Sequence, residues 1–167
     1  MPAKPLPDAE QLLAALIDRM RPAVGPDTGL VGIHTGGVWL AERLHRALGI
    51  KLPLGTLDIS FYRDDFNKKG LRRNVKSSDI PFDVDGCAVV IVDDVLHTGR
   101  TIRAAMNELF DYGRPASIRL AALVDRGGRE LPIAAEFTGA AISVDPEETI
   151  ELARDAQGKL SLQLGRN

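Results

Sequence analysis

Several features that would point to particular classes of protein are scarce or missing in this sequence. There is a single cysteine, Cys87, so an internal disulfide is excluded and a reducing compartment is favoured. No group of histidines and cysteines has zinc-site spacing, which predicts no metal site built from protein side chains. No apolar run approaches the ~20 residues of a membrane-spanning helix, and residues 1–7 lack the apolar stretch of a signal peptide. These absences predict a soluble, cytoplasmic protein with no membrane contact.

An excess of charge of one sign is also missing. The chain has 21 lysines and arginines against 23 acidic residues, a formal net charge of -2. General binding of nucleic acid by bulk positive charge is therefore excluded, although a local basic patch remains open. The 167 residues are 44% hydrophobic, which is typical of a soluble globular protein with a real core. We therefore expect a single domain over residues 1–167.

Hydrophobic spacing along the chain predicts alternating helices and strands. Helices are expected over residues 8–20, 38–48 and 101–112, strands over 30–34, 52–62, 88–92, 117–124 and 134–141, and a terminal hairpin from 149–152 and 160–164. This alternation favours an α/β fold with a central, mainly parallel sheet flanked by helices. Residues 1–29 would form an N-terminal helix and linker. Residues 63–79 contain few apolar side chains and read as a long mobile loop.

The segment Val89–Thr101, VVIVDDVLHTGRT, is the most informative stretch of the chain. Its apolar half predicts a buried strand, after which Asp93 and Asp94 offer acceptors for the vicinal hydroxyls of a sugar. Backbone amides around Gly99 and the start of the next helix suit a phosphate, because both direct partial positive charge to one point. An ordinary strand followed by a capped helix is the alternative, but the Thr-Gly-x-Thr loop favours a site for phosphorylated ribose. The loop is neither a Walker loop nor a Gly-x-Gly-x-x-Gly motif.

Val89–Thr101 resembles the phosphoribosyl pyrophosphate (PRPP) signature of type I phosphoribosyltransferases. More narrowly, the chain resembles the PyrR family, bacterial uracil phosphoribosyltransferases that also regulate pyrimidine genes. The resemblance runs from about Leu30 to Pro146 and includes VGIHTGGV at 31–38, DISFYRDD at 58–65, DIPF at 79–82 and VDRGGRELP at 124–132. The signature alone identifies the superfamily, whereas YRDD and the DRGGRELP segment select PyrR.

The resemblance implies a type I phosphoribosyltransferase fold with a small hood, and it assigns roles to particular residues. Asp93 and Asp94 would be catalytic and hold the ribose hydroxyls. The rest of the PRPP-binding loop would comprise Val95, Leu96, His97, Thr98, Gly99, Arg100 and Thr101. The loop that meets the pyrophosphate would comprise His34, Thr35, Gly36 and Gly37.

Further implications concern the flap, the base and the partners. Arg72 and Arg73, in the 63–79 flap, would stabilise the leaving pyrophosphate, and Arg126 would contact the base. Mg²⁺ would be bound through PRPP and pyrophosphate, largely by water. The implied partners are PRPP, uracil, UMP and the leader mRNA of the pyr operon, in a homodimer or higher homo-oligomer.

The chain departs from the PyrR pattern at several positions. Gly36 stands where an arginine is usual, His97 where a tyrosine is usual, and Gly128 where a histidine is usual. Residues 1–29 hold three cationic against four acidic side chains, so the N-terminal region lacks the basic character expected of an RNA-binding face. Three alternatives to a uracil enzyme therefore stay open: an RNA-binding attenuator with weak catalysis, a phosphoribosyltransferase for purines or orotate, and a non-enzymatic doubly wound domain.

Overall fold

The computed structural model describes residues 5–60 and 78–167, and it contains one parallel sheet and one antiparallel hairpin. The sheet has the strand order β2-β1-β3-β4-β5. Its strands are β1 (Gly29–Ile33), β2 (Gly55–Leu57), β3 (Ala88–Leu96), β4 (Ser117–Asp125) and β5 (Phe137–Ala141). The helices are α1 (Ala9–Met20), α2 (Gly36–Ala47) and α4 (Arg100–Phe110), and the hairpin pairs β6 (Glu148–Arg154) with β7 (Leu160–Arg166). The predicted type I phosphoribosyltransferase architecture, with a parallel sheet, flanking helices and C-terminal hairpin, is confirmed.

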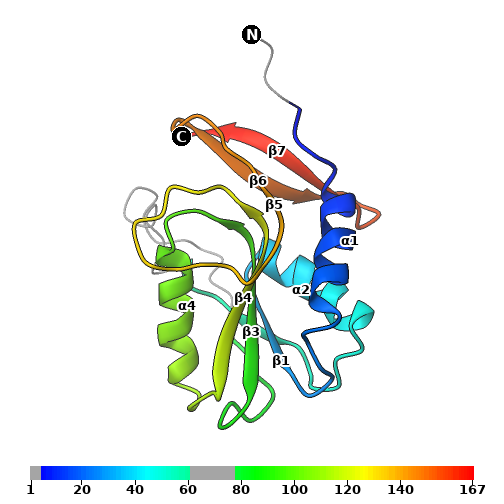
Figure 1. Ribbon diagram of the computed structural model, residues 1–167, viewed down its shortest axis with the longest axis vertical. Coiled ribbons are helices and arrows are strands. Elements are labelled where there is room, and N and C mark those ends of the chain that lie inside the picture. The colour runs from blue at the N-terminus through cyan, green and yellow to red at the C-terminus, as the bar shows by residue number, and fades with distance from the viewer. Residues whose placement is uncertain (1–4, 61–77) are drawn as a thin grey trace.

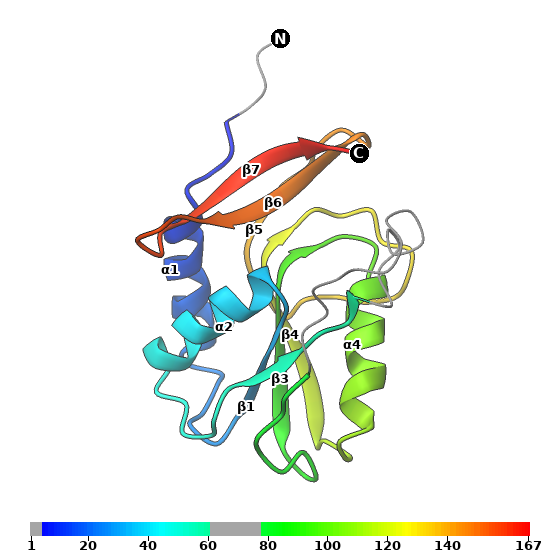
Figure 2. The same ribbon diagram turned by 180° about the vertical axis from the view of Figure 1, so that it is seen from behind.

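Helices cover both faces of the sheet, so side chains that alternate along β3 are buried on either side. Val90 and Val92 belong to a core cluster shared with α1, α2 and the hairpin, whereas Val89 and Ile91 belong to a second cluster shared with α4. Figures 1 and 2 show α1 and α2 on one face of the sheet and α4 on the other. The hairpin lies beyond the edge at which the parallel strands end (Figure 1).

Local sequence chemistry explains where α1 begins. The Asp8 side chain accepts hydrogen bonds from the backbone amides of Glu10 and Gln11, at 2.8 Å and 3.1 Å, and so satisfies two donors that the first turn leaves free. Leu12, Leu13 and Leu16 then place one apolar face of the helix in the core. The predicted helix over 8–20 is thus confirmed to within one residue.

Several predicted boundaries were wrong. The strand expected over 52–62 is limited to Gly55–Leu57 among the described residues, because the Asp58 carboxylate accepts hydrogen bonds from the amide and hydroxyl of Ser60 and turns the chain. The strand expected over 134–141 begins only at Phe137. By contrast, the strand expected over 88–92 continues to Leu96, because β4 runs beside it to Asp125.

The region expected to form a flap falls mostly on residues 61–77, which lie outside the described part of the chain. Asp79 is described, and its backbone forms an antiparallel bridge with Thr56, the middle residue of β2. No helix within residues 5–60 and 78–167 is long and apolar enough to cross a membrane.

Candidate functional site

The two aspartates of the signature lie inside the last part of β3. Asp93 is 3% exposed, and its Oδ1 accepts a 2.9 Å hydrogen bond from the amide of Asp94. Asp94 is half-buried and its Oδ1 accepts a 2.8 Å bond from the amide of Val95. These bonds to successive amides orient both carboxylates at the carboxyl edge of the sheet, where ligands of such folds bind.

The loop after β3 delivers backbone donors to the same edge. Gly99 precedes α4 with a φ of 94°, a left-handed conformation that glycine adopts without strain. The amide of Arg100 donates to Thr98 Oγ1 at 3.2 Å, which holds the loop against the first turn of the helix. The positive end of α4 and the hydroxyls of Thr98 and Thr101 can therefore meet a phosphate together.

The loop from His34 to Gly37 packs directly on the end of β3. A Cβ added at Gly36 would lie 2.4 Å from Asp94 Oδ2, and one added at Gly37 would lie 2.4 Å from the carbonyl oxygen of Val92. The peptide bond between His34 and Thr35 is cis. Helix α2 begins at Gly36, two residues earlier than the sequence predicted, so both glycines belong to its first turn. With Asp94 in this position, a side chain at position 36 would collide with the Asp94 carboxylate.

Arg129 fastens the turn after β4 to the loop after β3. It donates to Asp125 Oδ2 at 2.6 Å, to the carbonyl oxygen of His97 at 2.8 Å and to that of Ile133 at 2.7 Å. The Arg129 guanidinium holds the pKa of Asp125 below its ordinary value of 3.8, with a smaller contribution from the amide of Gly127. Arg129 is therefore a structural clamp between two loops, a role that the sequence analysis missed.

Two departures from the PyrR pattern meet in space. His97 Nδ1 lies 2.9 Å from the carbonyl oxygen of Gly127, and a Cβ added at Gly128 would lie 2.8 Å from His97 Cε1. The imidazole ring thus occupies the space that a side chain at 128 would need. His97 and Gly128 are therefore sterically coupled in this structure.

The signature and the turn after β4, which carries Arg126, line one cavity of ≈ 330 Å³. Its walls comprise Asp93, Asp94, Val95, Leu96, His97, Thr98, Gly99, Thr101, Ile102, Arg126, Thr149 and Asn167. The structure brings Arg126 beside the signature, in the wall of the same cavity. Thr149 and Asn167 come from the hairpin and had no sequence signal, since no motif marks them.

Other predicted residues lie differently. The side chain of Arg100 does not line the cavity, and its Nε donates to Glu130 at 2.8 Å. None of His34, Thr35, Gly36 and Gly37 is in the wall of this cavity, and the two glycines lie against Asp94 and Val92. Arg72 and Arg73 lie outside the described residues.

The carboxylates at this edge also suit a hard cation. Asp93 and Asp94 supply oxygen ligands of the type that Mg²⁺ prefers. Within residues 5–60 and 78–167 no group of three or more potential ligands is arranged to hold a metal ion by itself. The residues present therefore fit a cation that a substrate brings to the site with water in its shell.

The coupling of His97 to Gly128 can be tested with a matched pair of glycines. Gly127 and Gly128 have φ values of 78° and 77°, but only Gly128 has His97 beside its missing Cβ. We expect Gly127→Ala to cost about 1 kcal/mol of unfolding free energy from backbone strain, and Gly128→Ala to cost at least about 1 kcal/mol more. Urea unfolding measures both. In a His97→Ala background the difference should vanish, and its persistence would contradict the proposed contact.

The Arg129 clamp predicts a pH-dependent loss of stability. We expect Arg129→Gln to lower the free energy of unfolding by about 2 kcal/mol at pH 7, because the bonds to Asp125 and two carbonyl groups disappear. The lowered pKa of Asp125 contributes stability above its unfolded pKa, and this contribution is lost as pH falls through the folded pKa. The deficit measured by urea unfolding should therefore shrink below about pH 4.

Arg119→Gln serves as the control for this measurement, because Arg119 pairs with Glu136 at 3.3 Å on the surface. Its cost should stay under about 1 kcal/mol. A deficit of Arg129→Gln that is equal at pH 7 and at about pH 3 would show that pairing with Asp125 adds nothing.

Comparison with solved structures shows what this fold resembles. A hypoxanthine-guanine phosphoribosyltransferase from Bacillus anthracis matches with a TM-score of 0.66 and 20% identity, over 89% of this chain and 88% of the other. The hypoxanthine phosphoribosyltransferase of Trypanosoma cruzi matches with a TM-score of 0.63 and 19% identity, over 96% and 95% of the two chains. At these identities the likeness establishes the fold.

Sequence comparison is more specific. The phosphoribosyl transferase domain model matches residues 7–151, which is most of the chain. The bifunctional protein PyrR of Pseudomonas paraeruginosa is 50% identical over 156 residues, covering 90% of this chain and 91% of the relative. The bifunctional protein PyrR of Pseudomonas savastanoi pv. phaseolicola is 47% identical over 162 residues, covering 95% of both. An acidic pair and a loop suited to phosphate share one cavity, and the PyrR relatives match nearly the full length of the chain. The chain is therefore a phosphoribosyltransferase and belongs to the PyrR family.

Proposed function

We propose that this chain is a uracil phosphoribosyltransferase, which converts uracil and PRPP into UMP and pyrophosphate. The observation that carries the proposal is the single cavity lined by Asp93, Asp94, the Thr98–Thr101 loop and Arg126. Carboxylate acceptors that suit ribose hydroxyls lie there next to hydroxyl and backbone donors that suit a phosphate, which supports the proposal. The PyrR relatives support a pyrimidine as the base.

The 5-phosphate of PRPP would bind at the start of α4. Thr98, Gly99 and Thr101 line the cavity there, and the helix dipole favours negative charge. Asp93 and Asp94 would accept hydrogen bonds from the ribose 2- and 3-hydroxyls, because both carboxylates line the cavity at the same edge of the sheet. Val95, Leu96 and His97 shape the wall between these two subsites.

In the reaction, the bond between ribose C1 and the pyrophosphate oxygen breaks and a bond forms from C1 to uracil N1. The pyrophosphate leaves with the bonding electron pair, and the N1 proton is released. Positive charge builds on the ribose ring as in glycosyl transfer, so the protein's task is to position both partners and to stabilise the departing charge. The loop from His34 to Gly37 would receive the pyrophosphate through its backbone. Arg72 and Arg73 would add cations from the flap.

Magnesium would arrive with PRPP and neutralise part of the pyrophosphate charge. Asp93 and Asp94 would complete its shell through water, which agrees with the fit of these carboxylates to a hard cation.

Arg126 and the hairpin residues Thr149 and Asn167 would surround the base. The amide of Arg126 donates to the carbonyl oxygen of Leu96 at 2.9 Å, which fixes the backbone of the base-side turn relative to the signature. Asp125, held ionised by Arg129, keeps that turn in shape.

The acidic pair gives the sharpest test of this site. We expect Asp94→Asn to weaken binding of magnesium-PRPP about ten- to a hundredfold, because a charge-assisted hydrogen bond is worth about 1.5–3 kcal/mol. Isothermal titration calorimetry measures the affinity. Asp111→Asn, at the exposed end of α4, is the matched control and should bind like the parent protein.

Product formation from uracil, hypoxanthine, guanine and orotate should be compared in parallel. We expect UMP to be the main product. An unchanged PRPP affinity in Asp94→Asn would overturn the site, whereas formation of a purine nucleotide or orotidylate in place of UMP would overturn the choice of base.

We further propose that the chain acts in the cytoplasm as a homodimer or larger assembly and binds the leader mRNA of a pyrimidine operon when UMP is bound. The relatives' designation as bifunctional supports a second activity. Arg103 and Arg114 would contribute cations to the RNA, whereas Arg126 would face the base in the cavity. Arg119 and Arg129 contribute less, since each already pairs with an acidic side chain.

An electrophoretic shift assay tests this second activity. We expect the leader RNA to be retarded more strongly with UMP than without it, and the affinity to fall as salt rises, because phosphate contacts release counterions. A scrambled RNA of equal length is the control. Equal retardation of both RNAs, or none with UMP present, would contradict a regulatory role and leave catalysis alone.

A further inference from the structure

The open end of the hairpin forms part of the cavity wall. Thr149 lies near the start of β6, opposite Gly165 of β7, and it lines the same cavity as Asp93 and Arg126. Asn167 follows β7, and its amide donates to the carbonyl oxygen of Glu147 at 3.0 Å. A shift of the hairpin would therefore displace two residues of the cavity wall together.

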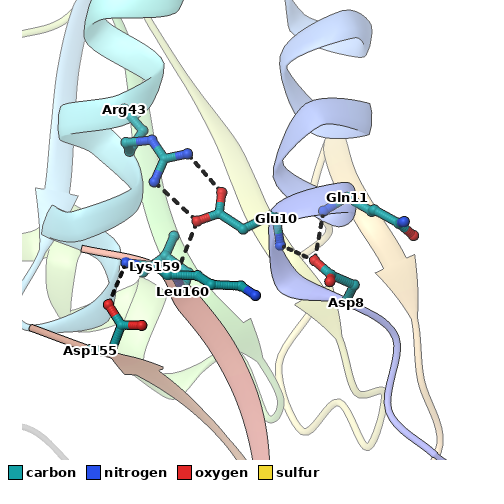
Figure 3. A network of polar contacts seen from close by, with 7 residues as sticks. All are labelled: Asp8, Glu10, Gln11, Arg43, Asp155, Lys159 and Leu160. Carbon is teal, nitrogen blue, oxygen red and sulfur yellow. Dashed lines mark hydrogen bonds and ion pairs between the residues drawn. The ribbon is translucent and has the colours of Figure 1, made fainter. Parts of the chain in front are cut away.

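The other end of the hairpin is held by a carboxylate on α1. Glu10 Oε1 accepts a 3.1 Å hydrogen bond from the amide of Leu160, the first residue of β7. Arg43 of α2 donates to both carboxylate oxygens of Glu10, at 3.2 Å and 2.7 Å. Figure 3 shows this arrangement, with the Glu10 carboxylate between Arg43 of α2 and Leu160 of the hairpin. The Arg43 guanidinium, as the largest influence, holds the pKa of Glu10 below its ordinary value.

Apolar packing holds this end of the hairpin but leaves a hollow beside α2. Leu160 is 2% exposed and belongs to the core cluster shared with α1 and α2. A hollow of ≈ 270 Å³ lies between α2 and the turn end of the hairpin, and Trp39, Arg43, Arg154 and Leu160 are among the residues that line it. Arg154 spans the hollow with its guanidinium 4.7 Å from the centre of the Trp39 ring. Directional polar contacts therefore add to the apolar packing that fixes the hairpin relative to α2.

Helix α2 is itself part of the site. It begins at Gly36, in the loop that packs on Asp94, and Arg43 lies two turns further along the same helix. Glu10 thus joins two elements that meet the substrate from different sides: the helix that starts at the pyrophosphate loop and the hairpin that lines the base side.

We propose that Glu10 is a positioning residue for the phosphoribosyltransferase reaction, because its carboxylate fixes the hairpin to α2 and so sets the width of the base side of the cavity. The proposal rests on the function assigned above and extends it to a side chain outside the cavity wall. Loss of this link should weaken binding of the base and of the nucleotide and leave the chemical step intact.

The test uses the full chain and the variant Glu10→Gln, in which an amide can still accept from Leu160 but no longer attracts Arg43. We expect the KM for uracil and the Kd for UMP to rise about fivefold or more, with kcat within about twofold of the parent. A loss of fold alone would lower kcat through the active fraction and leave KM unchanged. Asp18→Asn is the matched control, since Asp18 is an exposed carboxylate on the same helix as Glu10.

A second variant keeps the test decisive if Glu10→Gln does not fold. Arg43→Gln removes the same ion pair from the α2 side and should give the same rise in KM, and the double variant should be no worse than either single variant. Amide exchange of residues 148–154 and 160–166 should accelerate in both single variants.

Unchanged KM and Kd in both single variants, with the parent protein binding UMP, would overturn the positioning role and leave the proposed function standing. A parent protein that favours another base would be tested with the monophosphate of that base. If the parent binds no nucleoside monophosphate at all, the proposed function falls, and this inference falls with it.

Discussion

The parallel alignment of β3 with β4 is the constraint on which the site depends. The ladder between them continues to the pair Leu96 and Asp125, so the two strands end side by side. The loop that follows β3 and the turn that follows β4 must therefore emerge at the same edge. The backbone amides of Glu130 and Leu131 donate to the carbonyl oxygen of Thr98, and these hydrogen bonds join the turn to the loop. The signature loop and the turn that carries Arg126 become neighbours for this reason.

Residues buried on both faces make that alignment rigid. Val89 and Ile91 face α4, while Val90 and Val92 face the helices on the opposite side. A one-residue slip of β3 would exchange these two sets and disturb both cores, so the register is strongly specified. Rigid strand ends suit an enzyme whose main task is to hold two reactants in place, because misplacement of either one raises the barrier.

The sequence was a good guide wherever a residue acts through its own neighbours in the chain. Asp93, Asp94 and the Thr98–Thr101 loop are close in sequence, so a strand followed by a helix was enough to place them together. The turn that carries Arg126 was expected at the carboxyl edge of the sheet, and in the structure the end of β4 lies beside the end of β3. The extent of β3 was underestimated, since the partner strand, rather than the local hydrophobic run, decides where the ladder stops.

Residues that act across the fold could not be found in this way. Thr149, Asn167 and the clamp residue Arg129 depend on contacts between elements, and neither spacing nor residue type marks them. The bond from Leu160 to Glu10 joins residues 150 positions apart, a distance over which no local pattern carries information. Three departures from the family pattern, read one at a time, looked like independent losses. In the structure, the His97 ring lies where a side chain at position 128 would go, and Gly36 leaves room for the Asp94 carboxylate.

That shared volume has a consequence for any redesign of the site. A side chain can enter at position 128 only if the imidazole at 97 moves or is replaced, and one at position 36 only if the Asp94 carboxylate turns aside. A change at either position is therefore also a change in how His97 or Asp94 is oriented towards the cavity that both residues line.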